Sequence, residues 1–234
     1  KTIEQDCKIR RKIPLLAVGD NVLKKHMDFA SQNKEEYMET LKGLPVANAI
    51  NEKIIEEMKD WKGTIPHLAI VRVGERPDDM SYERGATKKM EKVGFRCTSY
   101  TFPADIDNDT FQKEFDKINE DEDIDGILLL RPLPKHLDEK AIENRIASVK
   151  DLDGISPMNL AKVYAGDPTG YGPCTAEAVI EMLDYAGVDL KGKRAVVIGR
   201  SLVIGKPVAM MLMKKNATVT VCHTKTVDMP GVCK

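Results

Sequence analysis

The sequence predicts an α/β protein whose parallel sheets are flanked by helices, and two features of the chain lead to that prediction. Short apolar runs that end at a glycine or at a proline-rich turn, such as 67–74 and 125–130, are typical of strands buried in a parallel sheet. Segments whose apolar residues recur at helical spacing lie between these runs. An alternation of strand and helix is the pattern of a parallel sheet with helices on its faces.

The longer, first part of the chain contains most of the predicted elements. They are, in order, a helix over 46–61, a strand over 67–74, a helix over 80–93, a strand over 95–102, a helix over 111–118 and a strand over 125–130. Gly63 and Gly94 end the first two helices, because glycine readily takes the left-handed conformation found after a helix. The last strand is broken by the proline-rich segment 131–134.

The last part of the chain predicts a helix followed by one βαβ unit. We expect the helix to be capped by Thr175 and to stop at Gly187. The unit comprises a strand over 194–199, a turn over 200–207, a helix over 208–215 and a strand over 217–222. Glycines at the first crossover of such a unit are typical of a Rossmann-type nucleotide-binding domain, which normally has five or six strands. We therefore expect that domain to be incomplete in this sequence.

Composition limits the class of function. The chain has 234 residues, 42% of them hydrophobic, and a net charge of -1, so it can bury a core and lacks the basic excess of a nucleic-acid-binding protein. It has no apolar run of about 18 residues and no signal-peptide pattern, so we expect no membrane association and a cytoplasmic location. Five cysteines without a Cys-x-x-Cys pair predict reduced thiols and no metal site.

The turn that follows the strand over 194–199 is the first candidate binding site. Gly199 and Gly205 do not have the G-x-G-x-x-G spacing, so the motif alone is weak evidence. Its place between a strand and a helix is stronger evidence, because a helix amino end binds phosphate through N–H groups and its dipole. Pro207 suits the first helical turn, where no N–H is needed. The turn predicts nucleotide binding, with a purely structural turn as the alternative.

The end of the strand over 217–222 bears on which cofactor is used. An acidic residue at this place binds the ribose 2′-hydroxyl of NAD, whereas this chain has His223, Thr224 and Lys225. Lys225 and Arg200 offer positive charge to a 2′-phosphate, and Thr224 offers a hydrogen bond. The pattern favours NADP over NAD, and an ordinary surface lysine is the alternative interpretation of Lys225.

From Met38 to Lys234 the chain resembles the methylenetetrahydrofolate dehydrogenase/cyclohydrolase family. The matching stretches, in the family's order and spacing, are Leu41–Ala47, Leu68–Gly74, Asp125–Leu128 with Pro132–Pro134, Lys150–Gly154, Pro173–Thr175, Gly199–Ser201 with Gly205–Pro207, and Thr220–His223. The resemblance implies a folate-binding catalytic domain over 38–172 and the start of a Rossmann-type NAD(P)-binding domain over 173–234. Residues 1–37 are then an extension of unknown role.

The resemblance also implies the residues of the site. The folate is expected in a cleft between the two domains, with Tyr82 stacked on its ring and Asp153 gripping the pterin nitrogens, so these two are the candidate catalytic residues. The further residues implied at the substrate are Leu130, Pro132 and Leu133. The residues implied at the cofactor are Thr175, Gly199, Arg200, Ser201, Gly205, Pro207, His223, Thr224 and Lys225. The family also implies a homodimer.

Two positions depart from the family pattern. In the family, a Tyr-x-x-x-Lys pair and a Gln-Leu-Pro-Leu-Pro segment supply a lysine and a glutamine, and here those positions hold Ala86 and Leu130. Lys88 lies on another helix face, and Lys89 lies on the face of Tyr82 but about 10 Å further along. Alternation along the strand places Arg131 on the face opposite to Leu130.

These departures lead to a functional prediction. In the family, hydride first leaves the methylene carbon of the folate, a step that needs alignment but no protein base. Water then attacks the methenyl carbon, and here a lysine with a lowered pKa would handle the proton. We therefore expect an NADP-dependent dehydrogenase with weak or absent cyclohydrolase activity. The alternatives are a bifunctional enzyme that uses Lys89 or a water network, and a folate- or nucleotide-binding protein without catalysis.

Overall fold

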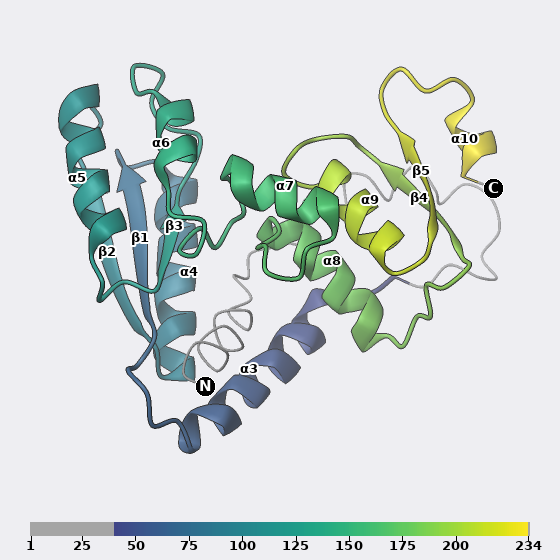
Figure 1. Ribbon diagram of the computed structural model, residues 1–234, viewed down its shortest axis with the longest axis horizontal. Coiled ribbons are helices and arrows are strands. Elements are labelled where there is room, and N and C mark those ends of the chain that lie inside the picture. Colours follow the sequence, from purple (N-terminus) through teal and green to yellow (C-terminus); the bar gives the residue numbers. More distant parts are fainter. Residues whose placement is uncertain (1–39, 234) are drawn as a thin grey trace. The chain divides into compact units, whose positions relative to one another are not determined.

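A computed structural model describes residues 40–233 of the chain (Figure 1). Its helices and strands are α3 (Gly43–Lys59), β1 (His67–Val73), α4 (Pro77–Val93), β2 (Arg96–Phe102), α5 (Asn108–Glu120), β3 (Gly126–Leu129), α6 (Glu139–Arg145), α7 (Pro157–Ala165), α8 (Cys174–Tyr185), β4 (Arg194–Ile198), α9 (Gly205–Lys214), β5 (Thr218–Cys222) and α10 (Met229–Val232). All paired strands in this part of the chain are parallel. The predicted α/β class is therefore confirmed.

The described residues divide into two compact units. One comprises 51–174, and the other comprises 40–50 together with 175–233. The first contains a three-stranded sheet in the order β2-β1-β3, and the second contains the pair β4-β5. The expected extension over 1–37 lies outside the described residues.

In the first unit, β1 is the central strand and every strand residue except Arg72 is buried. Its residues Ala69, Val71 and Val73 belong to a core cluster that also contains side chains of α5 and α6. Because side chains alternate along a strand, the even-numbered residues face the other side of the sheet, where α4 packs on β1 and β2 (Figure 1). The sheet is thus covered on both faces, as parallel sheets require.

Local chemistry explains the bounds of the helices around this sheet. Helix α4 begins three residues earlier than predicted because Pro77 stands at its first position, and it ends at Gly94, which has φ 80°. Helix α5 begins earlier than predicted because the side chain of Asp107 accepts a hydrogen bond from Thr110 N at 2.9 Å.

Two helices of this unit were not predicted. Helix α6 has seven residues, too few for a periodic apolar pattern, and is capped by Asp138, whose side chain accepts a hydrogen bond from Ala141 N at 3.0 Å. Helix α7 is capped by Ser156 and has Pro157 at its first position. The N-cap residue before each helix is visible in the sequence. The helices are too short to show the apolar periodicity that would confirm an N-cap signal.

The second unit contains the predicted βαβ arrangement. Strands β4 and β5 pair in register from Arg194 opposite Thr218 to Ile198 opposite Cys222. A second core cluster joins α8 and α9 to this pair. Thr175 is the second residue of α8 rather than its cap, because the helix already begins at Cys174. The cap position is then residue 173, so this part of the prediction is wrong by two residues.

Two further findings concern the whole described part of the chain. Cys97, Cys174, Cys222 and Cys233 form no disulfide bond. Among residues 40–233, none of the helices combines the length and the apolar character that crossing a membrane requires.

Candidate functional site

Helix α4 carries the first candidate residue, Tyr82, on the side of the sheet opposite to α5. Ala86 lies one turn further on, is 6% exposed, and occupies the position where the family pattern has lysine. Leu130 follows β3 and is also buried, with its N–H donating to Val71 O at 2.9 Å. Both departures from the family pattern are therefore small or apolar side chains in buried positions.

The loop that carries Asp153 is held by the carboxylate two residues before it. Asp151 is fully buried and its two oxygens accept hydrogen bonds from Ile155 N at 3.0 Å, Ser156 N at 2.8 Å and Asn159 Nδ2 at 2.9 Å. A buried carboxylate is stable only when it is hydrogen-bonded in this way. Asp151 therefore fixes the path of the loop, while Asp153 remains partly exposed.

Close packing fixes the other residues of the Lys150–Gly154 motif. Lys150 Nζ donates to Asn119 O at 2.8 Å and ties the loop to the end of α5. Gly154 has φ 59°, and a side chain on it would meet Tyr171 O at 2.6 Å. The motif needs glycine at its end for both reasons, because the left-handed conformation and the close backbone approach each disfavour a side chain.

The structure brings Asp153, Cys174 and Tyr82 together. Asp153 Oδ1 accepts a hydrogen bond from Cys174 N at 3.2 Å. Burial raises the pKa of the Tyr82 hydroxyl, and the neighbouring Cys174 and Asp153 raise it further. Burial also raises the pKa of the Asp153 carboxyl, against the opposing effects of the Cys174 N–H and the Arg131 guanidinium. Tyr82 is thus a protonated hydrogen-bond donor at neutral pH beside a carboxyl group that burial destabilises in its charged form.

Arg131 lies at this site, and the expectation that it points away is wrong. Its Nη2 is 3.8 Å from Asp153 Oδ2. Strand β3 ends at Leu129, so the alternation that was applied to Arg131 does not extend to it. Sequence reasoning missed Arg131 as a site residue, although its departure from the Gln-Leu-Pro-Leu-Pro pattern was visible.

The segment after Arg131 is fastened from two sides. Arg76, just before α4, donates to Pro132 O at 3.1 Å, and Glu139 of α6 accepts a hydrogen bond from Leu133 N at 2.8 Å. Pro132 is exposed, whereas the side chain of Leu133 belongs to the core cluster. The Leu133 side chain therefore packs in the core and its N–H is used by Glu139, which leaves its carbonyl for any contact with a ligand.

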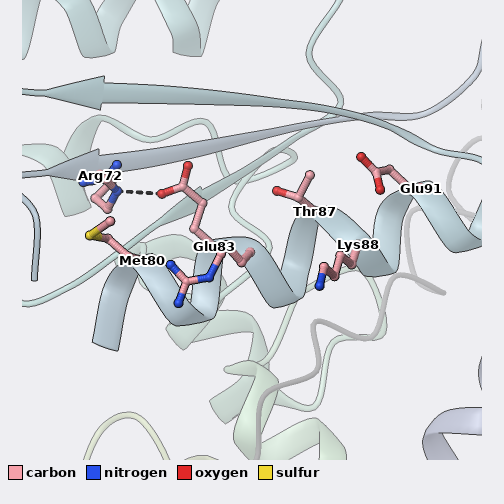
Figure 2. Close-up of a pocket in the computed structure, with 7 residues that line it drawn as sticks. Arg72, Met80, Glu83, Thr87, Lys88 and Glu91 are labelled. Atoms are coloured by element: carbon pink, nitrogen blue, oxygen red, sulfur yellow. Dashed lines mark hydrogen bonds and ion pairs between the residues drawn. The ribbon is translucent and has the colours of Figure 1, made fainter. Parts of the chain in front are cut away.

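A hollow of about 440 Å³ lies along a different stripe of α4 (Figure 2). It is lined by Arg72, Met80, Glu83, Arg84, Thr87, Lys88 and Glu91. The ion pair between Arg72 Nε and Glu83 Oε2, at 2.6 Å, forms part of its wall. Lys88 faces this hollow rather than the side of Tyr82, as expected. The pKa of Lys89 is lowered, chiefly by burial and also by Lys92.

In the second unit, the candidate turn is built from backbone. Gly199 has φ 128°, and its N–H donates to Cys222 O at 2.8 Å, so the turn begins beside the end of β5. A side chain on Gly205 would overlap the carbonyl oxygen of Gly199. Helix α9 therefore starts in direct backbone contact with the turn, which is the close approach that glycines allow in nucleotide-binding crossovers.

Ser201 accepts hydrogen bonds from the backbone amides at the start of α9. Its Oγ accepts hydrogen bonds from Ile204 N at 3.0 Å and Gly205 N at 3.4 Å, and its carbonyl accepts one from Lys206 N at 3.0 Å. Pro207, in the first turn as predicted, has no N–H to donate. Because Ser201 occupies these amides, few N–H groups remain free in the first turn. A phosphate at this helix end would therefore interact mainly with the helix dipole and with segment 200–203.

The segment after β5 forms a second turn beside the first. His223 N donates to Thr226 Oγ1 at 2.8 Å, and His223 Nδ1 accepts from Lys225 N at 3.1 Å. Arg200, Thr224 and Lys225 are exposed, and Thr175 lies within α8 of the same unit. The turn contains no carboxylate that could bind a ribose 2′-hydroxyl.

Comparison with known proteins gives matches in both units. Residues 41–153 match the family described as "Tetrahydrofolate dehydrogenase/cyclohydrolase, catalytic domain", and residues 173–234 match its "NAD(P)-binding domain". The chain is 48% identical over 195 residues to the "Bifunctional protein FolD" of Clostridium kluyveri, a match that covers 82% of this chain and 69% of that relative.

Solved structures agree with these matches. The bifunctional enzyme FolD-methylenetetrahydrofolate dehydrogenase/cyclohydrolase from Campylobacter jejuni has a TM-score of 0.78 and 34% identity, over 82% of this chain and 69% of that one. The methylenetetrahydrofolate dehydrogenase-cyclohydrolase of Trypanosoma brucei, complexed with NADP cofactor and inhibitor, has a TM-score of 0.73 and 36% identity, over 80% of this chain and 65% of that one.

Proposed function

The chain belongs to the tetrahydrofolate dehydrogenase/cyclohydrolase family, and from that premise we propose that Tyr82 and Asp153 bind 5,10-methylenetetrahydrofolate for oxidation by NADP. The observation that carries this proposal is the cluster of Tyr82, Asp153 and Cys174, three residues from distant parts of the chain that meet in one unit. The carboxylate of Asp153 would accept hydrogen bonds from pterin N–H groups, and the ring of Tyr82 would stack on the substrate.

The residues present fit a dinucleotide. The backbone contact between Gly199 and Gly205 leaves no room for a side chain on Gly205, and the exposed cations Arg200 and Lys225 follow β4 and β5 at the same sheet end. When bound, the nicotinamide accepts the hydride. The chain's own contribution is to align the folate and to leave its nitrogen lone pair free to expel that hydride, so no protein base is required.

The charge around Asp153 suits this first step. Loss of hydride leaves a positively charged methenyl bridge, and the described site sets the three carboxylates of Asp153, Glu139 and Glu143 against two cations, Arg131 and the exposed Lys140 that pairs with Glu143. With Ala86 in place of lysine, α4 adds no cation one turn beyond Tyr82. Negative charge in a partly buried site favours the developing cation.

Hydrolysis of the methenyl product is the second activity that we propose. The relatives of similar sequence are named bifunctional, which favours the bifunctional alternative over a dehydrogenase that lacks hydrolysis. Among the described residues, Lys89 lies on the face of α4 that carries Tyr82, about 10 Å further along, and burial lowers the pKa of its ammonium group, so a water network would have to link it to the methenyl carbon.

A dehydrogenase with little cyclohydrolase activity is the second candidate, and one observation favours it. Ala86 and Leu130 are both buried and neither can move a proton. Supplying methenyltetrahydrofolate and measuring its conversion to the 10-formyl compound distinguishes the two. Enzyme-dependent hydrolysis at a rate comparable to hydride transfer supports a bifunctional enzyme. If the second candidate is right, the double variant Ala86→Lys with Leu130→Gln should raise the rate of hydrolysis about 100-fold.

The proposed folate role is tested by Asp153→Asn. We expect this variant to lose at least about 100-fold in kcat/KM for methylenetetrahydrofolate, because the amide offers a neutral and partly donating face to the pterin, while NADP affinity persists. Asp109→Asn, on an exposed position of α5, is the control and should behave as the parent chain. Equal activity of both variants removes Asp153 from the site, and NADP binding without turnover in the parent chain supports the non-catalytic alternative.

The preference for NADP over NAD rests on Arg200, Thr224 and Lys225, and it agrees with the NADP bound to the T. brucei relative. Lys225→Glu should lower the ratio of NADP to NAD affinity about tenfold, because a carboxylate repels the 2′-phosphate and accepts from a 2′-hydroxyl. A homodimer in the cytoplasm completes the proposal.

A further inference from the structure

Three carboxylates surround the guanidinium of Arg131. Its Nη1 is hydrogen-bonded to Glu143 Oε1 at 3.1 Å and lies 3.6 Å from Glu139 Oε1, and its Nη2 lies 3.8 Å from Asp153 Oδ2. The side chains of Arg131 and Glu143 are only 19% and 11% exposed. Solvent therefore screens these charges weakly, and the guanidinium is held between α6 and the loop of Asp153.

The groups that face Asp153 come from four segments. They are Arg131 after β3, Asp151 in its own loop, Cys174 at the start of α8 and Tyr82 of α4. Of these groups, Arg131 carries the positive charge, and a guanidinium keeps that charge at every pH at which the protein is folded. The nearby Asp151 is a second carboxylate and acts against the ionisation of Asp153.

We propose that Arg131 is a positioning residue of the folate site, which holds the carboxylate of Asp153 ionised and oriented while Glu139 and Glu143 anchor it. The proposal rests on the proposed function, because it concerns the carboxylate assigned to the pterin. The ionised form matters since a carboxylate offers two accepting oxygens to N–H donors, whereas a carboxylic acid turns one of them into a donor.

The test is the pH dependence of kcat/KM for methylenetetrahydrofolate in the full chain. Arg131→Leu removes the charge and restores the residue of the family pattern, and we expect its acidic limb to move to higher pH by about one unit. Below that limb the variant should lose about tenfold relative to the parent, and well above it the two should converge. A defect that is only structural would lower activity equally at every pH.

Arg131→Lys keeps the charge and should keep the parent's acidic limb, whereas Arg131→Gln, which retains a planar hydrogen-bonding group, should shift it as Arg131→Leu does. Arg131→Gln also carries the test if Arg131→Leu fails to fold. Calorimetric titration with tetrahydrofolate at a pH on either side of the limb gives the same comparison without turnover, with about tenfold weaker binding of the neutral variants only on the acidic side.

Two results overturn the proposal. One is a folded Arg131→Leu or Arg131→Gln variant with the parent's acidic limb, and the other is an Arg131→Lys variant whose limb shifts as far as that of the neutral variants. Absence of turnover and of tetrahydrofolate binding in the parent chain at every pH would instead refute the proposed function, so the two failures are distinguishable.

Discussion

The two candidate sites of this chain are built in different ways. The site around Asp153 gathers charged and polar side chains from α4, the segment after β3, the loop before α7 and the start of α8. The turn at Gly199 is one contiguous segment whose shape comes from backbone contacts and from the single side chain of Ser201. The first depends on electrostatics between distant residues, and the second depends on the absence of side chains.

This difference determines how each site responds to substitution. The fold of a backbone site tolerates changes in charge but no added atom at its contact point, because a carbonyl and a helix start cannot move apart without breaking β4 or α9. A side-chain site tolerates small changes in volume but not a change in which groups are ionised. Substitutions at Gly205, Asp151, Ser201 and Gly85 separate these two sensitivities, with expected effects that decrease in that order.

Gly205→Ala should have the largest effect. The added methyl group overlaps the Gly199 carbonyl, so we expect the free energy of unfolding of this unit to fall by more than about 3 kcal/mol and NADP affinity to fall at least tenfold. Denaturant unfolding and cofactor titration measure both. Gly192→Ala is the matched control, since Gly192 has φ 73° with open space around it and should cost only about 1 kcal/mol. Equal losses in the two variants would show that backbone contact is not what makes the turn sensitive.

Asp151→Ala should destabilise the first unit by about 3 kcal/mol, because it leaves the amides of Ile155 and Ser156 and the side chain of Asn159 without their acceptor. Asp153→Asn, two residues away, should leave stability unchanged or slightly higher at neutral pH, since it removes a charge that burial disfavours. Thermal unfolding of both variants checks this contrast. Should Asp153→Asn be the less stable of the two, the assignment of one carboxylate to the fold and the other to the ligand is wrong.

Ser201→Ala should cost about 1 kcal/mol, comparable to the loss of a helix N-cap, because it removes the acceptor of Ile204 N just before α9 and of Gly205 N at its first residue. Urea unfolding of the full chain measures the change. Ser201→Asp keeps an acceptor and should retain the parent's stability while it repels a phosphate, so cofactor affinity should fall in Ser201→Asp at unchanged stability.

Gly85→Ala should have the smallest effect and the opposite sign. Gly85 is an exposed interior residue of α4 with open space around its α-carbon, so alanine should raise the free energy of unfolding by about 0.5–1 kcal/mol. Chemical denaturation measures it. Activity should be unchanged, and a loss of folate affinity would show that the exposed side of α4 takes part in binding.

Local signals sufficed to predict the strands, the α/β class and the turn between β4 and α9, because each depends on residues close together in sequence. The buried run of β1 and the glycines at 199 and 205 are of this kind. The short α6 and the contact of Arg131 with Asp153 were missed, because the first lacks a periodic pattern and the second depends on where β3 ends. The family resemblance, confirmed by the matches over both units, pointed to Asp153 but not to its cation.

The burial of Asp153 has an energetic consequence of its own. Because folding raises the pKa of this carboxyl, its contribution to stability is fully present below the ordinary pKa of aspartate and is lost as the pH rises through the raised value. At neutral pH the Asp153 carboxylate is therefore ionised in surroundings that disfavour its charge. A ligand that donates hydrogen bonds to this carboxylate stabilises the charged form. The rise in melting temperature that the ligand causes should therefore grow with pH.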